Sequence, residues 1–393
     1  MSTLASETHI MRQDGMEAPL FAFRSARGVV QGQGLGAALP RGPAETLGAR
    51  VAAFFRLAGR DALLAGALPF AREAEDYLVQ PRTVSRAVQE VAAVPRPAAR
   101  WQLAHEPDAA GYAASVQRAL DIMRQEAAQG PGRREVLTKI VLSRSLLARA
   151  DAPIDLQGLL RRLSADPSVT GFLVPLPPRG GAPRVLAGAT PELLLSKTGT
   201  RILSHPLAGS ARREVDAAAD SANAAALARS DKDRREHAIV ADFILDTLAP
   251  YCRQLSAPQG TTLTSTNSMW HLGTRIEGEL KDASISSAEL AAALHPTPAV
   301  CGLPRAHAAR LIGEIEAYDR DFYAGAVGWC DAAGDGAWYV SIRCAEIAGN
   351  TARLYAGAGI VPGSDPWAEA AETGAKYGAL LAALGIELEE TRL

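Results

Sequence analysis

Two pairs of acidic residues have the spacing that places both members on one face of a helix. Asp233 and Glu236 are three residues apart in "SDKDRREHAIV", and Glu369 and Glu372 have the same spacing in "PWAEAAETGAKYGALL", where Lys376 follows four residues later. Side chains three or four residues apart lie on the same side of an α-helix. One such pair alone is typical of a solvated surface. The second pair, however, lies in a stretch dominated by Ala and Gly, which suits close packing.

Two acidic pairs that face each other across a cleft would form an oxygen-rich site for a hard cation. Mg²⁺ binds one or two carboxylates directly and keeps several waters, which other groups can hold. The four carboxylates are therefore candidate magnesium ligands if the two helices meet in the fold.

Two further charged residues interrupt apolar stretches. Lys139 occurs in "VLTKIVLS", where strand alternation places it on the same face as Val141. It is either a charge that protects an edge strand or a buried lysine whose amine can act as a base. Glu192 follows a proline and leads into an apolar strand in "GATPELLLS". Burial there would raise its pKa and keep a proton available, so the two residues are a plausible base and acid.

Several other residues are candidates for holding an anionic ligand. Arg343 lies inside the strand-like segment "YVSIRCAEI", and an arginine within a sheet usually has a carboxylate partner from the protein or from a ligand. Gly357 and Gly359 in "YAGAGI" offer amides that a ligand carboxylate could approach closely. His271 in "MWHLGT", taken alone, is more typical of a structural histidine.

The elements that would position these residues follow from apolar periodicity and from Gly and Pro punctuation. Helical spacing predicts helices over 44–59, 107–129, 223–248 and 366–384. Strand-like segments cover 136–150, 169–177, 184–199, 201–209, 268–280 and 324–361. Hairpin turns are expected at 334–336 and 349–350. Long strand stretches interrupted by a few helices favour an α+β fold with large antiparallel sheets over strict βα alternation. No helix opens after "GAGIVPG", so this segment is not a dinucleotide fingerprint.

Composition excludes several classes of protein. The 393 residues are 48% hydrophobic and 21% charged, with 41 Lys+Arg against 43 Asp+Glu and a net charge of −2. The length alone would allow two or three domains. The near-neutral charge gives no reason to expect nucleic acid or an anionic membrane as a partner. No apolar run approaches the roughly 20 residues that span a bilayer.

The termini and the cysteines indicate a cytoplasmic protein. Residues 1–17 are interpreted as a loose tail, which is polar where a signal peptide would need its apolar stretch. The four cysteines, which form no CxxC motif, are expected to be small buried hydrophobes in a reducing compartment. They are Cys252, Cys301, Cys330 and Cys344.

The motifs taken together resemble those of chorismate-utilising enzymes, and in particular isochorismate synthases of siderophore pathways. The resemblance is dense from about residue 110 to 388 and loose before that. Its ten motifs occur in the family's order: "KIVLSR", "AGATPELLLS", "HPLAGSARR", "SDKDRREH", "WHLGTRIEG", "LHPTPAVCGLPR", "FYAGAVGWCD", "SIRCAEI", "LYAGAGIVPGS" and "EAAETGAK".

The resemblance implies a single catalytic domain over 18–393, built from two packed, mainly antiparallel sheets flanked by helices. It also implies chorismate as substrate and Mg²⁺ as cofactor. By the same resemblance, Lys139 matches the general base that activates water for attack at C2 of the ring. Glu192 matches the general acid that protonates the departing C4 hydroxyl.

The remaining site residues are also assigned by resemblance. Glu236 and Glu372 match the carboxylates closest to Mg²⁺, whereas Asp233 and Glu369 match an outer pair that acts largely through water; Asp233 is Glu in some relatives. The metal would hold the ring carboxylate, with Lys376 nearby. The enolpyruvyl carboxylate would be held by Arg343, Tyr323 and the amides of Gly357 and Gly359. Other pocket-lining positions match Thr190, Gly209 and His271.

Within the family, the expected activity is isochorismate synthase. Anthranilate synthases use ammonia and need no base at Lys139. Salicylate synthases share the lysine and the glutamate, go on to eliminate pyruvate, and carry a hydroxyl residue near Ala299. Salicylate formation and a non-catalytic chorismate-binding role are the alternatives. A monomer is expected, and the downstream route is catecholate siderophore, salicylate or menaquinone synthesis, which all begin with the same reaction.

Overall fold

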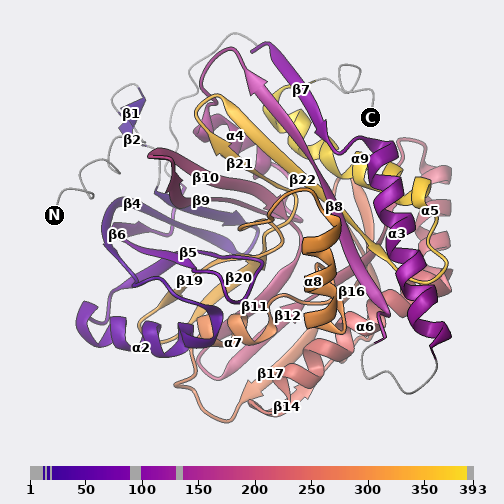
Figure 1. Cartoon of the computed structure of the whole chain (residues 1–393). Helices are drawn as coiled ribbons and strands as arrows, with labels where there is room; N and C mark the ends of the chain where they lie inside the picture. The colour runs from indigo at the N-terminus through magenta and orange to yellow at the C-terminus, as the bar shows by residue number, and fades with distance from the viewer. Residues whose placement is uncertain (1–11, 14–15, 18–19, 89–98, 130–135, 387–393) are drawn as a thin grey trace.

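The computed structural model describes residues 12–13, 16–17, 20–88, 99–129 and 136–386 (Figure 1). Most of the predicted loose tail therefore lies outside the described residues. From that tail the structure describes β1 (Arg12–Gln13) and β2 (Met16–Glu17), which pair antiparallel.

One long series of antiparallel strand pairings organises the fold. Its strands are β3 (Phe21–Ser25), β4 (Gly28–Ala38), β5 (Leu63–Leu68), β6 (Tyr77–Ser85), β7 (Trp101–Glu106), β8 (Lys139–Ala150), β9 (Thr170–Arg179), β10 (Ala182–Thr190), β11 (Leu193–Thr198), β12 (Arg201–His205), β14 (Cys252–Ser256), β17 (Ile276–Leu280), β19 (Ala326–Asp331), β20 (Gly336–Val340), β21 (Cys344–Ala348) and β22 (Thr351–Ile360). Successive neighbours are β7, β8, β22, β21, β10, β9, β3, β4, β6, β5, β19, β20, β11, β12, β17 and β14.

Two smaller groups complete the strand structure. The short β18 (Gly302–Leu303) pairs with the start of β8. A three-stranded sheet has the order β13 (Leu207–Arg212), β16 (Met269–Thr274) and β15 (Thr261–Ser265). The predicted hairpin turns lie where expected, between β19 and β20 and between β21 and β22.

Helices flank these sheets. They are η2 (Ala44–Thr46), α2 (Leu47–Ala58), α3 (Ala109–Ala128), α4 (Leu156–Leu163), α5 (Ala217–Arg229), α6 (Asp231–Leu248), α7 (Ser287–Leu294), α8 (Arg305–Ile315) and α9 (Pro366–Leu384). Figure 1 shows α3, α5 and α9 grouped at the right and α2 with α7 at the lower left. No helix among the described residues is long and apolar enough to cross a membrane.

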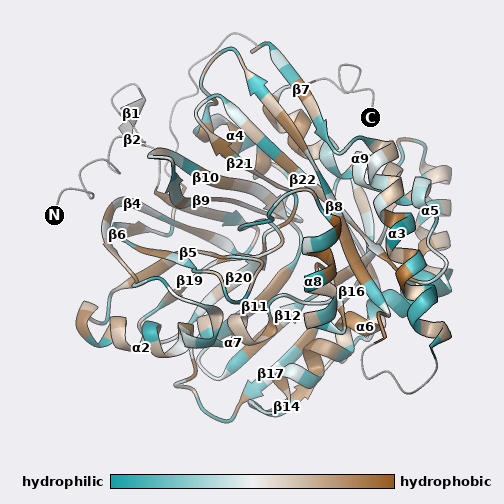
Figure 2. Ribbon diagram, in the orientation of Figure 1, coloured by the Kyte–Doolittle hydropathy of each residue, from teal (hydrophilic) through white to brown (hydrophobic). Residues whose placement is uncertain are grey.

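The hydrophobic core has two parts. The larger part joins β5, β8, β11, β19, β20 and β22 to α2, α6, α7 and α8, and the smaller part lies beneath α4 and α9. Figure 2 shows hydrophobic residues along central strands such as β8, whereas α6 and its neighbours carry hydrophilic stretches. All four cysteines are free and buried, as predicted. The expected α+β fold of large antiparallel sheets with flanking helices is confirmed.

Local signals account for the helix ends. Asp108 caps α3 by accepting a hydrogen bond from the Gly111 N–H at 2.8 Å, and Asp365 caps α9 from the Ala368 N–H at 2.8 Å. Pro366 occupies the first turn of α9, which ends at Gly385 with φ of +79°. The predicted span 366–384 is therefore confirmed.

The prediction of a single helix over 223–248 is wrong, because the helix is interrupted at Ser230. This residue has an extended backbone, with φ of −67° and ψ of 111°, and separates α5 from α6. Its hydroxyl accepts a hydrogen bond from the Asp233 N–H at 3.2 Å, so it caps the second helix instead of continuing the first. The break gives α6 its own N-terminus, with Asp233 in the first turn.

Candidate active site

One cavity brings together residues that are far apart in the sequence. Lys139 and Thr190 are not among the residues that line this cavity. All other candidate residues line it. These are Glu192, Gly209, Asp233, Glu236, His271, Tyr323, Arg343, Gly357, Gly359, Glu369, Glu372 and Lys376.

The two acidic helices meet at this cavity, as the magnesium hypothesis requires. Lys232 of α6 donates a hydrogen bond to Glu369 Oε1 of α9 at 2.6 Å, which ties the helices together. One turn further along the same face of α9, Glu372 Oε1 accepts from Ser210 Oγ of β13 at 2.7 Å and lies 2.7 Å from Lys376 Nζ. Both acidic pairs therefore line the same cavity.

The carboxylates of this cavity interact electrostatically with one another and with lysines. Burial, and then the neighbouring Glu372, raises the pKa of Glu369, and burial likewise raises the pKa of Asp233. Burial also acts to raise the pKa of Glu372, but Lys376 and Ser210 hold it below its ordinary value. Among the described residues, no three Asp, Glu, His or Cys side chains converge closely enough to hold a metal ion as they stand.

Two glycines leave the space that these carboxylates occupy. A Cβ at Gly359 would lie 2.1 Å from Glu236 Oε1 and 3.3 Å from Lys139 Cε. Gly209 has φ of +74°, which favours glycine, and a Cβ there would lie 3.0 Å from the Asp233 Cβ. Any larger residue at either position would displace an acidic side chain of the cavity.

Lys139 is fully buried beside the cavity. It begins β8 and pairs through its backbone with Leu303 of β18, so the edge-strand interpretation is wrong. Its Nζ lies 3.0 Å from Glu236 Oε1 and makes no hydrogen bond within the described residues. The side chain therefore approaches the cavity floor at Gly359, with Glu236 as its counter-ion.

Glu192 has the properties of a general acid. It is 3% exposed, and its Oε1 is buried without a hydrogen-bond partner among the described residues. Burial raises its pKa to about 8, although Lys139 and the Leu207 N–H act to lower it. Thr190 Oγ1 accepts a hydrogen bond from the Glu192 N–H at 3.3 Å, so Thr190 orients the backbone of the acid.

Arg343 and Tyr323 also line the cavity. The Tyr323 ring stacks on Tyr355 with a centroid distance of 4.6 Å and an interplanar angle of 9°. Among the described residues, Arg343 has no ion pair with a protein carboxylate, and burial lowers the pKa of its guanidinium. The expected position of Arg343 inside a strand is wrong, because it lies in the bend between β20 and β21 with φ of +50°.

His271 also lines the cavity. Its Nδ1 lies 3.3 Å from the Gly209 carbonyl oxygen, and its buried Nε2 has no partner among the described residues. Burial, together with Arg343 and Lys376, lowers its pKa to about 3, so the ring is neutral at physiological pH.

Three lining residues with polar side chains were not identified from the sequence alone, namely Ser210, Lys232 and Tyr355. Ser210 and Lys232 lie inside conserved-order motifs, each directly beside a residue that was identified. Tyr355 shares the period of two with Gly357 and Gly359 along β22, and this alternation is the signal that could have found it.

The chain is similar to known proteins over most of its length. The family model described as "Chorismate binding enzyme" matches residues 69–385. The "Putative isochorismate synthase MenF" of Mycobacterium tuberculosis (strain ATCC 25618 / H37Rv) is 45% identical over 336 residues, which cover 84% of this chain and 88% of that protein. The isochorismate synthase DhbC of Bacillus subtilis (strain 168) is 49% identical over 255 residues, which cover 64% of each chain.

A solved structure is similar over the whole fold. The crystal structure of the "putative 2,3-dihydroxybenzoate-specific isochorismate synthase, DhbC from Bacillus anthracis" matches with a TM-score of 0.87 and 37% identity. The match covers 98% of this chain and 100% of that one. The family model, the relatives and this structure agree, and the chain belongs to the chorismate-binding enzyme family.

Proposed function

We propose that the protein is an isochorismate synthase, which converts chorismate to isochorismate by attack of water at C2 and loss of the C4 hydroxyl. The observation that carries the proposal is that Glu192, whose pKa is raised to about 8 by burial, and the buried Lys139 both lie at or beside one acidic cavity. The names of the similar proteins support the same reaction.

The charges of the cavity support a dianionic substrate accompanied by a divalent cation. Lys232, Arg343 and Lys376 line the cavity, and Lys139 lies beside it, so four cations balance the four carboxylates. Chorismate has two carboxylates, and its binding would leave two negative charges without a counter-charge. A divalent cation supplies that charge.

The residues present fit Mg²⁺. Carboxylate oxygens are the ligands that this ion prefers, and Gly359 leaves room for Glu236 beside Lys139. In this proposal Glu236 and Glu372 would hold the ion directly, and Asp233 and Glu369 would act through water. When bound, the ion neutralises the ring carboxylate of the substrate.

The protein's own groups carry the proton transfers. Glu192 donates a proton to the departing C4 hydroxyl, so water leaves instead of hydroxide. Lys139 can act as the base only as the neutral amine, so its ammonium must first release a proton to solvent. The amine then accepts a proton from the water that forms the new C2–O bond, and the ring double bonds shift as the C4–O bond breaks. One proton is given and one is taken, so the overall reaction is an isomerisation. Each transfer is worth about 10²–10⁴-fold in rate.

The remaining residues position the substrate. Arg343, which lacks a protein carboxylate partner among the described residues, is proposed to bind the enolpyruvyl carboxylate together with Tyr323 and the amides of Gly357 and Gly359. The Lys376 ammonium donates a hydrogen bond to the Gly357 carbonyl oxygen at 2.7 Å and also lies 2.7 Å from Glu372 Oε1. Its positive charge therefore lies between the Gly357 carbonyl and the Glu372 carboxylate. His271, Gly209 and Thr190 shape the rest of the pocket.

Ala299 favours isochorismate over salicylate as the product. It lines the cavity, and salicylate synthases carry a hydroxyl residue near this position. The alanine side chain has no group that could form a hydrogen bond with the substrate there. A non-catalytic binding protein would have no need for the acid, the base and the four carboxylates together.

Product analysis tests this function. Purified protein is incubated with chorismate and Mg²⁺, and the products are separated by liquid chromatography. We expect isochorismate without salicylate, loss of turnover with excess EDTA, and recovery when Mg²⁺ is restored. Salicylate as the main product, anthranilate with added ammonia, or turnover that persists in EDTA would each contradict the proposal.

Replacing Gly359 with alanine should lower kcat/KM for chorismate by about 10²-fold, because the new Cβ would displace Glu236 from Lys139 and from the proposed metal. Gly378→Ala is the matched control, since it lies on α9 and a Cβ there meets nothing within 4 Å. The control should keep its turnover and gain slightly in melting temperature. Normal kinetics for Gly359→Ala would show that the position of Glu236 is not needed.

A further inference from the structure

The segment 316–324, between α8 and β19, carries Tyr323 to the cavity through an unusual backbone. Within the described residues, the non-glycine residues with positive φ are Asp321 at +48°, Ala324 at +57° and Arg343 at +50°. Ala324 and Arg343 line the cavity, and Asp321 is two residues before Tyr323. Left-handed backbone at residues other than glycine is unfavourable and persists only where the surroundings hold it.

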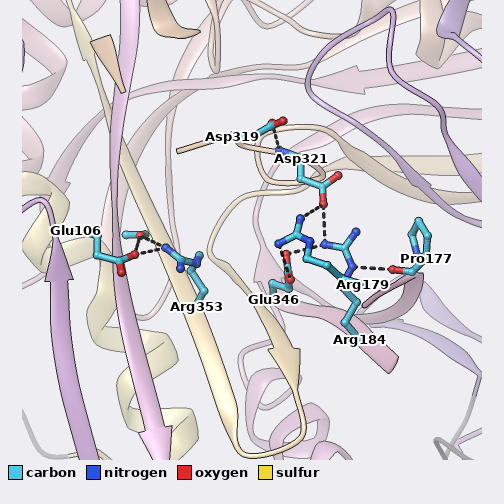
Figure 3. Close-up of polar contacts among 9 residues, drawn as sticks. Glu106, Pro177, Arg179, Arg184, Asp319, Asp321, Glu346 and Arg353 are labelled. Carbon is cyan, nitrogen blue, oxygen red and sulfur yellow. Dashed lines mark hydrogen bonds and ion pairs between the residues drawn. The ribbon is translucent and has the colours of Figure 1, made fainter. Parts of the chain in front are cut away.

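Asp321 is held by both its backbone and its side chain. Its N–H donates to Asp319 Oδ1 at 2.8 Å, and its carbonyl accepts from the Phe70 N–H at 2.8 Å. Its Oδ2 accepts from Arg184 Nη1 at 2.6 Å and from Arg179 Nη2 at 2.8 Å (Figure 3). Asp321 therefore fixes the turn that leads into Tyr323, whose N–H closes the turn onto the Arg320 carbonyl at 2.8 Å.

Arg184 connects this turn to the sheet. It lies on β10, is 6% exposed, and donates from Nε to the Pro177 carbonyl at 2.7 Å. Its Nη1 also donates to Glu346 Oε2 at 3.0 Å, on the neighbouring strand β21 (Figure 3). Arg179 reaches the same carboxylates but is 64% exposed, so Arg184 is the rigid member. None of Arg184, Glu346 and Asp321 is among the residues that line the cavity.

We propose that Asp321, anchored by Arg184 and Glu346, is a positioning residue that holds Tyr323 and Ala324 against the cavity and thereby sets its affinity for chorismate. The inference rests on the proposed function, because chorismate is the ligand. Arg184, Glu346 and Asp321 do not contact the substrate and would act on it only through the segment 316–324. Their loss should therefore change substrate binding more than the proton transfers at Glu192 and Lys139.

Three replacements of Asp321 separate the anchor from the backbone. Asp321→Ala removes the carboxylate and disfavours positive φ, and we expect it to raise the KM for chorismate by about 10- to 100-fold with a smaller change in kcat. Asp321→Gly accepts positive φ but has no carboxylate, so its KM should also rise. Asp321→Asn tolerates positive φ and keeps an oxygen that accepts from Arg184, so it should stay within about threefold of the wild-type KM.

Glu106→Gln is the matched control. Glu106 on β7 forms an ion pair with Arg353 on β22 and accepts a hydrogen bond from Ser145 Oγ of the intervening β8, away from the loop (Figure 3). We expect this variant to keep the wild-type KM. If Asp321→Ala does not fold, as judged by its thermal melt, Asp321→Gly carries the test.

Equilibrium binding separates this inference from the proposed function. The Kd of chorismate is measured by calorimetry with Mg²⁺ in a Glu192→Gln background, with and without Asp321→Ala. An increased Kd matching the increased KM supports the positioning role, and equal Kd values overturn it. If chorismate does not bind to the Glu192→Gln variant even with Asp321 intact, the proposed function itself fails.

Discussion

Replacing Lys139 with alanine should lower kcat for chorismate by about 10²–10⁴-fold, while the protein still binds the substrate. The lysine is fully buried, and its Nζ lies 3.0 Å from Glu236. In the proposed reaction it takes the proton of the attacking water, and its Cε would lie 3.3 Å from a Cβ at Gly359, which lines the cavity. Product formation is followed by liquid chromatography, and the Kd of chorismate is measured by calorimetry.

A second buried lysine provides the control for this prediction. Lys197 on β11 is 2% exposed, forms an ion pair with Asp335 at 2.9 Å, and does not line the cavity. Lys197→Ala also leaves a carboxylate without its buried cation, so it should lower the melting temperature, yet kcat per folded molecule should remain that of the wild type. A Lys139→Ala variant with normal kcat would remove the proposed base.

Much of the fold could be predicted because its signals are local. The span of α9 depends on Asp365 as a cap, on Pro366 in the first turn and on Gly385 after the last, and all three are visible in the sequence. The hairpins follow from glycine-containing turns in the same way. Ser230 shows the weakness of periodicity, because a single capping serine splits a segment whose apolar pattern continues across it.

The candidate site could be predicted as a set of residues but not as a set of contacts. The i, i+3 spacing placed Asp233 and Glu236 on one face, but which partner each carboxylate meets depends on how α6 packs against α9. Lys232 illustrates this, since it neighbours Asp233 in sequence but binds Glu369, 137 residues away. Family resemblance supplied the roles of these residues, which spacing alone left open between a metal site and a solvated face.

The charged anchor of Asp321 had no sequence signal at all. Arg184, Asp321 and Glu346 come from three separate segments, and each is individually typical of a surface charge. Positive φ at Asp321 is likewise a consequence of its partners, because an aspartate does not require that backbone as glycine often does. Interactions of this kind are determined by tertiary structure, so they become visible only when the strands are paired.

Replacing Glu192 with glutamine should lower kcat by about 10²–10⁴-fold and remove the pH dependence that this acid imposes. Burial raises the pKa of Glu192 to about 8, so the carboxyl group stays protonated at neutral pH, where an exposed glutamate would be ionised. The forward reaction needs the protonated form. In the wild type, kcat/KM should therefore fall about tenfold per pH unit above that pKa, because the ionised fraction cannot protonate the leaving hydroxyl.

The pH profile of kcat/KM from pH 6 to 10 tests this assignment, with Glu277→Gln as the matched control. Glu277 is a half-exposed glutamate on β17 that pairs with Arg275, and its replacement should leave both the rate and the alkaline limb unchanged. A Glu192→Gln variant that retains the wild-type limb would assign the limb to another group.

The charge of Lys139 offers an independent check on the same acid. Its ammonium acts to lower the pKa of Glu192, in opposition to burial. Removing that charge in Lys139→Ala should therefore move the Glu192 titration to higher pH, which ¹³C NMR of labelled glutamate carboxyls can follow without turnover. A titration that stays in place would mean that the two groups do not interact across the cavity, and the proposed acid and base would then not act as a pair.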